Sequence, residues 1–251
     1  MTDNWEQGAG SREPDAPLLD RRTFLRIGAA GGAASLVAAC GWDGGSAVRP
    51  ALLSVSRFND WVGEKVLYSP TRLAPTYDTS RRSPRLPRYF ISRTMPLLRD
   101  PAAWRLVVDG LVERPLALSL DDLIAMPRVS YTVKHHCVEG WSAVASWHGV
   151  PVSAVVERCR PRREARFIEF TSFDAGYANG WDLASAMHPQ TILAYGLNDN
   201  SLPAAHGAPL RLYAPTKLGY KMTKYLLGMR FTDRRPGGYW EDRGYPWFAG
   251  V

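Results

Sequence analysis

The stretch VKHHCVEGWSAVASWHG, residues 133–149, brings together three histidines, a cysteine, a glutamate and two tryptophans. The residues that lead into it, from Val129, are typical of a strand that enters a loop. In an extended chain successive side chains point to opposite sides, so His135 and Cys137 share one side and His136 takes the other. The stretch therefore predicts a thiol and an imidazole on the same side of a strand end.

Several kinds of site could use Cys137. Zinc could bind Cys137 and His135, but structural zinc sites favour C-x-x-C pairs, and the sequence has none. A nucleophilic or redox-active thiol needs a base, which His135 or His136 could supply, but no resolving cysteine follows in C-x-x-C spacing. A buried core thiol is the third alternative. The stretch alone leaves these alternatives open.

A second polar stretch, LPAAHGAPLRLYAPTKLGYKMTKYL, occupies residues 202–226. Its basic and hydroxyl side chains alternate with glycines: His206, Arg211, Lys217, Lys221, Thr223 and Lys224, with Gly207 and Gly219. Basic side chains and a permissive backbone suit a phosphate-bearing cofactor. A solvated charged loop would have a similar composition, so this stretch alone does not decide between the two. Its combination with Cys137 upstream favours a cofactor site.

The composition is that of a folded protein with one or two domains. Of 251 residues, 45% are hydrophobic, 11% are aromatic and 22% are charged, which excludes a disordered chain. The formal net charge of +7 suits an anionic ligand, an acidic partner or an anionic membrane surface. No basic helix, RNA-binding signature or zinc-finger spacing is present, so nucleic acid is not expected as a partner.

The N-terminus is predicted to be a twin-arginine export signal, residues 1–40. Residues 20–40 read DRRTFLRIGAAGGAASLVAAC, with an apolar run from Ile27 to Ala39 that is too short for a comfortable transmembrane helix. The ending LVAAC resembles a lipobox, in which Cys40 would carry a lipid, and cleavage near Ala39 is the alternative. We expect a periplasmic or extracytoplasmic protein, with Cys40 as a candidate membrane anchor.

The remaining chain predicts an α+β domain, mainly β, over residues 85–235. A linker and extended segment, residues 41–84, precedes it, and an aromatic tail, residues 236–251, follows it. Strands are expected at 104–112, 129–137, 165–173, 191–197, 208–215 and 226–232. Helices are expected at 120–125, with Ser119 as N-cap, at 151–159 and at 183–189. Cys159 is expected to be a buried thiol, although an oxidising compartment would permit a disulfide with Cys137.

Three motifs resemble a known family: HCVEGWSAVASWHGVPV, AMHPQTILAYGLNDNSLPAAHGAPLRLYAP and LGYKMTKYL. They resemble, in order, the sulfite-oxidase-type molybdopterin-dependent oxidoreductase domain. The branch they resemble most is that of the periplasmic protein-methionine-sulfoxide reductase catalytic subunit. Two positions depart from that branch, since His206 stands where asparagine is usual and His136 where arginine is usual.

The resemblance implies a sulfite-oxidase-like fold and a mononuclear molybdenum held by one molybdopterin without a nucleotide. It implies that Cys137 ligates the metal and that Tyr177 lies near it. The cofactor-binding residues that it implies are Tyr89, Phe90, Thr171, Ser172, His206, Arg211, Lys221, Met222, Thr223 and Lys224. The Lys221–Lys224 run would hold the pterin phosphate with its backbone N–H groups and lysines.

The implied reaction is oxygen-atom transfer, with reduction of methionine sulfoxide or a small S- or N-oxide as the first expectation. Oxidation of sulfite or a related anion is the alternative, which His206, Tyr177 and the positive charge favour. A non-catalytic anchored binding module is a third hypothesis. The sequence has no C-x-x-C-H haem motif, so a separate haem-containing electron partner is expected, and the chain is expected to be a monomer. The aromatic tail either packs over the domain or contacts a partner.

Overall fold

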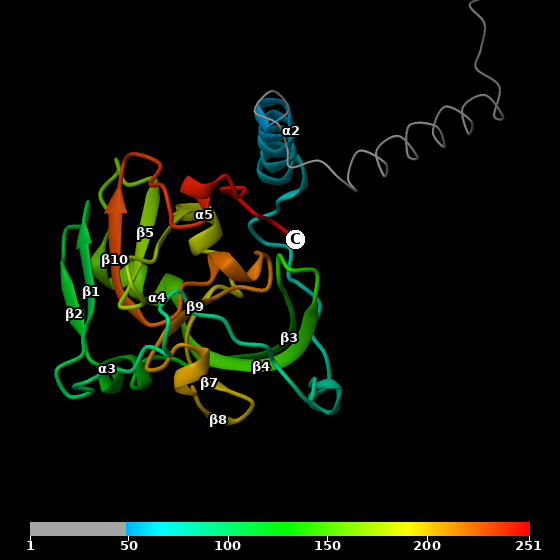
Figure 1. Ribbon diagram of the computed structural model, residues 1–251. Helices are drawn as coiled ribbons and strands as arrows, with labels where there is room; N and C mark the ends of the chain where they lie inside the picture. Colours follow the sequence, from blue (N-terminus) through cyan, green and yellow to red (C-terminus); the bar gives the residue numbers. More distant parts are fainter. Residues whose placement is uncertain (1–48) are drawn as a thin grey trace, which may run out of the picture. The chain divides into compact units, whose positions relative to one another are not determined.

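The computed structural model describes residues 49–251 (Figure 1). The predicted signal and Cys40 lie outside the described residues. Residues Leu52–Val251 form one compact unit. Within the described part of the chain, no helix has the length and apolarity needed to cross a membrane.

The first of two sheets has the strand order β2-β1-β10-β5-β6 (Figure 1). Its central strand, β10 (Leu226–Thr232), pairs in parallel with β1 (Leu106–Gly110) and antiparallel with β5 (Phe167–Ser172). The outer strands β2 (Leu116–Leu118) and β6 (Ala178–Asp182) pair antiparallel with β1 and β5. The last long strand of the chain therefore joins two earlier parts of the sheet.

The second sheet is built on β4 (Ser142–Pro151), which pairs antiparallel with β3 (Val129–His136) and β7 (Ile192–Leu197). Strand β7 also pairs with β8 (Asn200–Ser201) and β9 (Arg211–Tyr213). Because β3 ends at His136, Cys137 begins the loop to β4, as predicted. The β4–β7 ladder shifts register between His148 and Gly149.

Short helices cover the core between the strands. They are α3 (Leu120–Ile124), α4 (Val152–Cys159) and α5 (Leu183–Ala186). Ser119 caps α3 as predicted, because its hydroxyl accepts the Asp122 N–H and the Asp122 carboxylate accepts the Ser119 N–H and hydroxyl.

The main core is shared by both sheets. It includes Val108 of β1, Phe170 of β5, Leu193 of β7 and the fully buried Cys159 of α4. The Cys159 prediction is confirmed, and both Cys137 and Cys159 are free thiols, so no disulfide joins them.

Residues 49–67 correct the predicted linker. They form helix α2 (Arg49–Val62) and a π-helical turn (Gly63–Leu67). The periodic signal was weak because α2 carries apolar side chains both toward the domain, such as the partly buried Leu53, and toward solvent, such as Phe58. The rest of residues 68–104 is mostly extended, as expected, with one bridge between Thr76 and Val133 and a short 3-10 turn, Thr79–Arg81.

The aromatic tail packs on the domain. Phe248 and Ala249 are buried, and their N–H groups donate to the Asp60 carboxylate of α2 at 2.8–3.0 Å. The Trp247 indole N–H donates to the Pro236 carbonyl at 2.7 Å. The tail therefore forms part of the same folded unit as the two sheets.

Candidate active site

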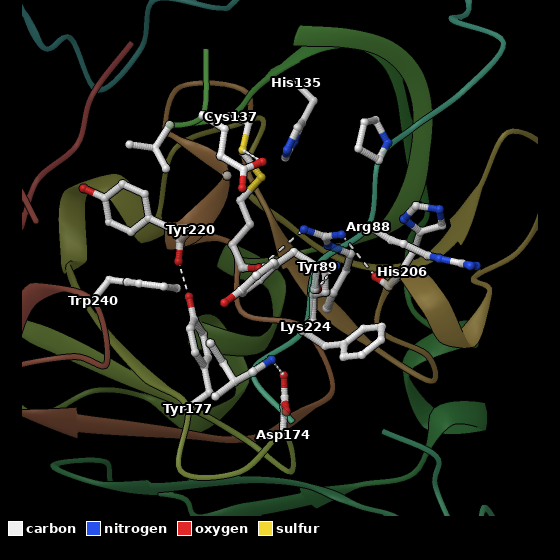
Figure 2. Close-up of a pocket in the computed structure, with 18 of the residues that line it drawn as sticks. Arg88, Tyr89, His135, Cys137, Asp174, Tyr177, His206, Tyr220, Lys224 and Trp240 are labelled. Carbon is white, nitrogen blue, oxygen red and sulfur yellow. Dashed lines mark hydrogen bonds between the residues drawn. The ribbon is translucent and has the colours of Figure 1, made fainter. Parts of the chain in front are cut away.

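A cavity of about 270 Å³ opens beside the end of β3 (Figure 2). Five separated parts of the chain line it: residues 86–91, residues 135–147 of the β3–β4 hairpin, residues 172–177, residues 206–224 and the tail. From the tail come Trp240 and Tyr245. The fold thus brings the two sequence stretches with the most polar chemistry to one cavity.

Cys137 is presented to the cavity by a tight turn. Its N–H donates to the Trp141 carbonyl at 3.0 Å, and its own carbonyl accepts the Gly140 N–H at 3.1 Å. Gly140 has φ of +88°, a left-handed conformation that glycine adopts without strain. The half-buried Cys137 Sγ lies 3.7 Å from Glu139 Oε2, and this carboxylate also accepts the Trp141 indole N–H at 2.9 Å.

Without a cation beside it, the Cys137 thiol keeps its proton. Burial raises its pKa above the usual value, and the negative Glu139 carboxylate opposes ionisation further. A metal ion at the sulfur would reverse this effect, because coordination stabilises the thiolate. The site therefore suits a soft metal ligand better than a free nucleophile.

Opposite Cys137 the cavity holds a group of basic side chains. Arg211 of β9 is almost fully buried, and its guanidinium stacks on the Trp147 ring at 4.8 Å. Its N–H groups donate to backbone carbonyls, those of His206 at 3.1 Å, Met222 at 3.4 Å and Leu212 at 3.4 Å. Lys224 Nζ donates to the Tyr89 carbonyl at 2.6 Å (Figure 2).

The pKa values of these groups show uncompensated positive charge. Burial lowers the pKa of Lys224 to about 7 and of Arg211 to about 10, and Arg211 itself lowers the Lys224 value further. Burial and then the Arg211 charge lower the pKa of His135 to about 3 and of His206 to about 4, so both imidazoles are neutral. A bound anion would relieve this repulsion.

The acidic side chains that line the cavity do not neutralise this group. Asp174 accepts the Ile91 N–H at 2.6 Å and both the N–H and hydroxyl of Ser92. Glu139 is on the Cys137 side. The cavity therefore combines a sulfur ligand at one side with an anion-binding group at the other.

Tyr177 is held rather than free. Its hydroxyl donates to the Tyr220 carbonyl, which also accepts an N–H from Asn179 Nδ2 at 2.9 Å (Figure 2). Burial raises the Tyr177 pKa well above its usual value. At neutral pH this hydroxyl is a donor to the backbone and fixes the Tyr220 peptide beside the cavity.

Most of the predicted site residues meet in this cavity. Those that line it are Tyr89, Phe90, Cys137, Ser172, Tyr177, His206, Arg211, Met222 and Lys224. Thr171, Lys221 and Thr223 do not line it. On β5 the alternation of side chains turns Ser172 toward the cavity and Thr171 toward Gly228.

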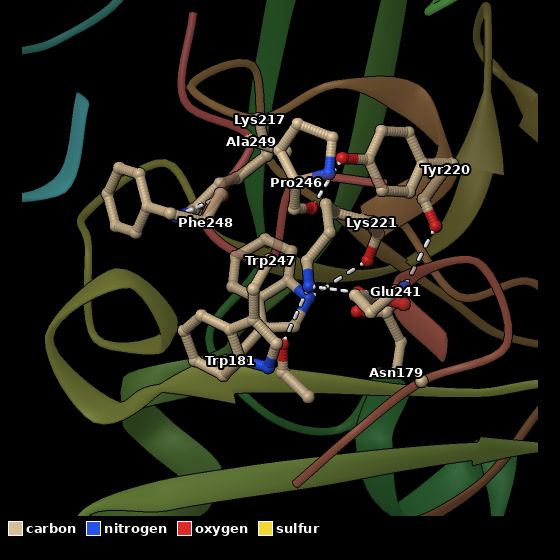
Figure 3. A network of polar contacts seen from close by, with 12 residues as sticks. Asn179, Trp181, Lys217, Tyr220, Lys221, Glu241, Pro246, Trp247, Phe248 and Ala249 are labelled. Carbon is tan, nitrogen blue, oxygen red and sulfur yellow. Dashed lines mark hydrogen bonds and ion pairs between the residues drawn. The ribbon is translucent and has the colours of Figure 1, made fainter. Parts of the chain in front are cut away.

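The predicted contact of the Lys221 ammonium with a pterin phosphate is corrected. Lys221 Nζ forms a buried ion pair with Glu241 of the tail and donates to the Gly180 carbonyl at 2.8 Å (Figure 3). Lys217 is likewise turned to the tail, where its ammonium donates to the Phe248 carbonyl at 2.8 Å. Both lysines serve the packing of residues 236–251 and leave Lys224 as the lysine of the cavity.

Several cavity residues were missing from the predicted set: Arg88, His135, Glu139, Trp141, Asp174, Tyr220, Trp240 and Tyr245. Strand alternation did place His135 on the Cys137 side, where it was considered as a zinc ligand or a base but not as a residue of the cofactor cavity. Trp240 and Tyr245 carried no such signal, since their approach depends on the tail's long-range packing. Zinc has no support in residues 49–251, where no three His, Cys, Asp or Glu side chains gather as a metal site.

Comparison with known proteins gives a consistent set of matches. Residues 93–240 match the family model described as the oxidoreductase molybdopterin binding domain. A putative protein-methionine-sulfoxide reductase subunit of Azospira oryzae is 40% identical over 243 residues, which cover 93% of this chain and 88% of that protein. The protein-methionine-sulfoxide reductase catalytic subunit of Campylobacter jejuni is 29% identical, over 95% of this chain and 82% of its own.

One solved structure supports the fold alone. The sulfane dehydrogenase SoxCD from Paracoccus pantotrophus aligns with a TM-score of 0.52 at 23% identity. The alignment covers 55% of this chain and 40% of that one.

Proposed function

The chain belongs to the oxidoreductase molybdopterin-binding domain family, and on that premise we propose that it is an exported reductase of methionine sulfoxide or a small S- or N-oxide. The predicted family, sulfite-oxidase-type fold, molybdopterin cofactor and oxidoreductase class are confirmed. The substrate is supported by the relatives from Azospira and Campylobacter, whose names contain protein-methionine-sulfoxide reductase. The observation that carries the proposal is the cavity itself, with Cys137 facing a buried group of cations.

The residues of the cavity fit the cofactor. Cys137 offers a soft sulfur ligand to molybdenum. Arg211 and Lys224, with the imidazole of His206, would hold the pterin and its phosphate. The negative phosphate would compensate the positive charges of Arg211 and Lys224. The unpartnered, buried His135 Nδ1 is a further polar atom at the same wall. When bound, molybdopterin would supply a redox-active molybdenum for two-electron oxygen-atom transfer.

The protein's own groups have three tasks in this reaction. The aromatic mouth, where the Tyr89 and Trp240 rings lie 6.2 Å apart, would receive an apolar methyl sulfide group and limit the access of water. Glu139, whose Oε2 accepts a hydrogen bond from the Cys137 thiol at 3.7 Å, is placed to hold or move a proton at that oxygen. Reduction of a sulfoxide consumes two protons and two electrons and yields a sulfide and water.

Sulfite oxidation is the second candidate, because Arg211, Lys224 and His206 would also attract a small anion. Two steady-state assays separate the candidates: reduced viologen with methionine sulfoxide, and sulfite with ferricyanide. Turnover in the first assay supports the proposal. Turnover in the second assay alone would replace it with the oxidase.

The Cys137→Ala variant tests the role of the sulfur. We expect it to lose methionine sulfoxide turnover, with molybdenum content followed by elemental mass spectrometry. Cys159→Ala is the matched control, since Cys159 lies in the main core, and it should keep both activity and metal. A Cys137→Ala protein with full activity would refute the assignment, and a wild-type protein without metal or turnover would favour a non-catalytic binding module.

Export, anchoring and the electron partner complete the proposal. The twin-arginine pattern before Ile27 supports export after folding, and the LVAAC ending supports a lipid on Cys40. The Campylobacter relative is named a catalytic subunit, which supports a separate redox partner, for which we propose a haem protein. Mass spectrometry of the mature N-terminus tests the lipid: an unmodified Cys40 would exclude it.

A further inference from the structure

Helix α2 stands at the periphery of the domain, beside the C-terminal tail (Figure 1). The Asp60 carboxylate accepts the backbone N–H groups of Phe248 and Ala249. Arg235 Nη2 lies 4.0 Å from Asp60 Oδ2 and 3.7 Å from Glu64 Oε2, so the acidic side chains of α2 and of the turn after it are both directed to the domain and its tail. Asp60 and the partly buried Leu53 therefore mark the side of α2 that contacts the domain.

The side of α2 away from Asp60 is apolar and exposed. Val55, Phe58 and Trp61 lie three residues apart, so they cover about a third of the helix circumference, and they are 53–61% exposed. The Phe58 and Trp61 rings stack on each other, with their centroids 6.1 Å apart. We call these three residues the α2 apolar face; Leu52, Val66 and Leu67, before and after them in the chain, are exposed as well.

This concentration is unusual for a protein surface. Fifteen large hydrophobic side chains are exposed within residues 49–251, and six of them fall in residues 52–67. Scattered exposed hydrophobic residues are ordinary, whereas a contiguous group of this kind marks an interaction site. The question is which partner covers it.

The chain that precedes α2 points to lipid. The apolar run from Ile27 ends at Cys40, and only residues 41–48 separate this end from the helix. Eight residues span at most about 29 Å when fully extended, so an anchor at Cys40 would keep α2 close to the bilayer surface. The exposed Arg57 adds a positive charge to a helix whose acidic groups are turned away, which suits anionic lipid.

The shape and residue types also favour lipid over protein. The three side chains spread along a convex helix surface, and a fluid layer adapts to such a surface without a complementary groove. Tryptophan and phenylalanine are the side chains that lie well at the boundary between headgroups and acyl chains. We propose that the α2 apolar face rests on the phospholipid surface to which the N-terminal segment directs the chain, with α2 in the plane of the interface.

Vesicle flotation tests this proposal on the mature exported chain. The parent protein carries Cys40→Ser, so that no acyl chain contributes, and mass spectrometry verifies that its N-terminus follows the apolar run. The probe is a vesicle of phosphatidylethanolamine with phosphatidylglycerol. The test variant is Val55→Asn/Phe58→Asn/Trp61→Asn. The matched control, Leu73→Asn/Leu97→Asn/Ile124→Asn, removes three other exposed apolar side chains.

We expect the parent and the control to float with the vesicles and the α2 variant to bind at least about ten-fold less. Thermal unfolding should be the same for all three, because the substituted side chains are exposed. The proposal is overturned if the parent does not float, or if the α2 variant floats as well as the parent. It is also overturned if light scattering shows a dimer that the α2 variant loses, since a second copy would then cover the face.

Discussion

The buried ion pair between Lys221 and Glu241 gives the sharpest prediction from this structure (Figure 3). We expect Glu241→Gln to lower the free energy of unfolding by about 1–3 kcal/mol at pH 7, because it leaves the buried Lys221 amine without its carboxylate. The two side chains are only 1% and 5% exposed, so water cannot replace the lost partner.

Proton release by Lys221 limits this loss. A buried lysine escapes an unfavourable charge by releasing its proton, which costs about 1.4 kcal/mol for each pH unit below its ordinary pKa of 10.5, or about 5 kcal/mol at pH 7. Burial already lowers the Lys221 pKa to about 8 with Glu241 present, so the wild type bears about 3.5 kcal/mol of this cost. Proton release therefore adds about 1.4 kcal/mol in the variant, and the lost hydrogen bond between the two side chains accounts for the rest of the expected loss.

Urea unfolding followed by tryptophan fluorescence is the assay, and Glu157→Gln, at an exposed glutamate of α4, is the control. The deficit of Glu241→Gln should shrink as the pH rises through about 8, because the folded variant has already released the Lys221 proton that the folded wild type gives up only near that pH. The double variant Lys221→Met/Glu241→Leu should recover most of the loss, since it buries no charge. A loss below about 1 kcal/mol in the single variant, or an equal loss in the double variant, would refute the reasoning.

Three further predictions concern the fold. Burial lowers the Lys217 pKa to about 7, so the folded state releases this proton at a lower pH than the unfolded state does. The stability of the wild type relative to Lys217→Met should therefore rise with pH between about 7 and 10. A stability difference that stays constant over this pH range in urea titrations would contradict the prediction. Gly149→Ala would place a Cβ 2.0 Å from the Leu193 carbonyl oxygen. We therefore expect the free energy of unfolding to fall by about 1–3 kcal/mol or more. An unchanged free energy would show that β7 can shift away from the new methyl group without loss of stability. Ser119→Ala removes the cap of α3 and should cost about 1 kcal/mol by the same measurement, with Ser130→Ala as a comparison in which no cap is lost.

Local patterns in the sequence predict much of the fold. The strand that ends beside Cys137, the capped helix after Ser119 and the buried thiol of Cys159 each depend on neighbouring residues, and each is confirmed. Strand β4 was missed because it is buried over most of its length and shows little alternation between apolar and polar residues. Strand β6, ANGWD, was missed because glycine, asparagine and aspartate are rare in strands.

Site residues that belong to a local sequence motif could be predicted, whereas those whose position depends on long-range packing could not. Strand alternation and the family motifs indicated Cys137, Arg211 and Lys224. Lys221 belongs to the same motif as Lys224, yet its ammonium turns to a carboxylate 20 residues away in the tail. No local pattern encodes that choice, because it depends on where residues 236–251 come to rest.

The position of β10 in the first sheet has a consequence for synthesis of the chain. Its parallel partner, β1, is separated from it by more than a hundred residues, and its other partner, β5, has no contact with β1 in the sheet order. Until residue 232 has left the ribosome, the sheet exists as two unjoined halves. Such distant pairing slows folding and delays it until translation is nearly complete. A chain shortened before β10 would therefore emerge with open strand edges, a substrate for chaperones and proteases rather than a smaller enzyme.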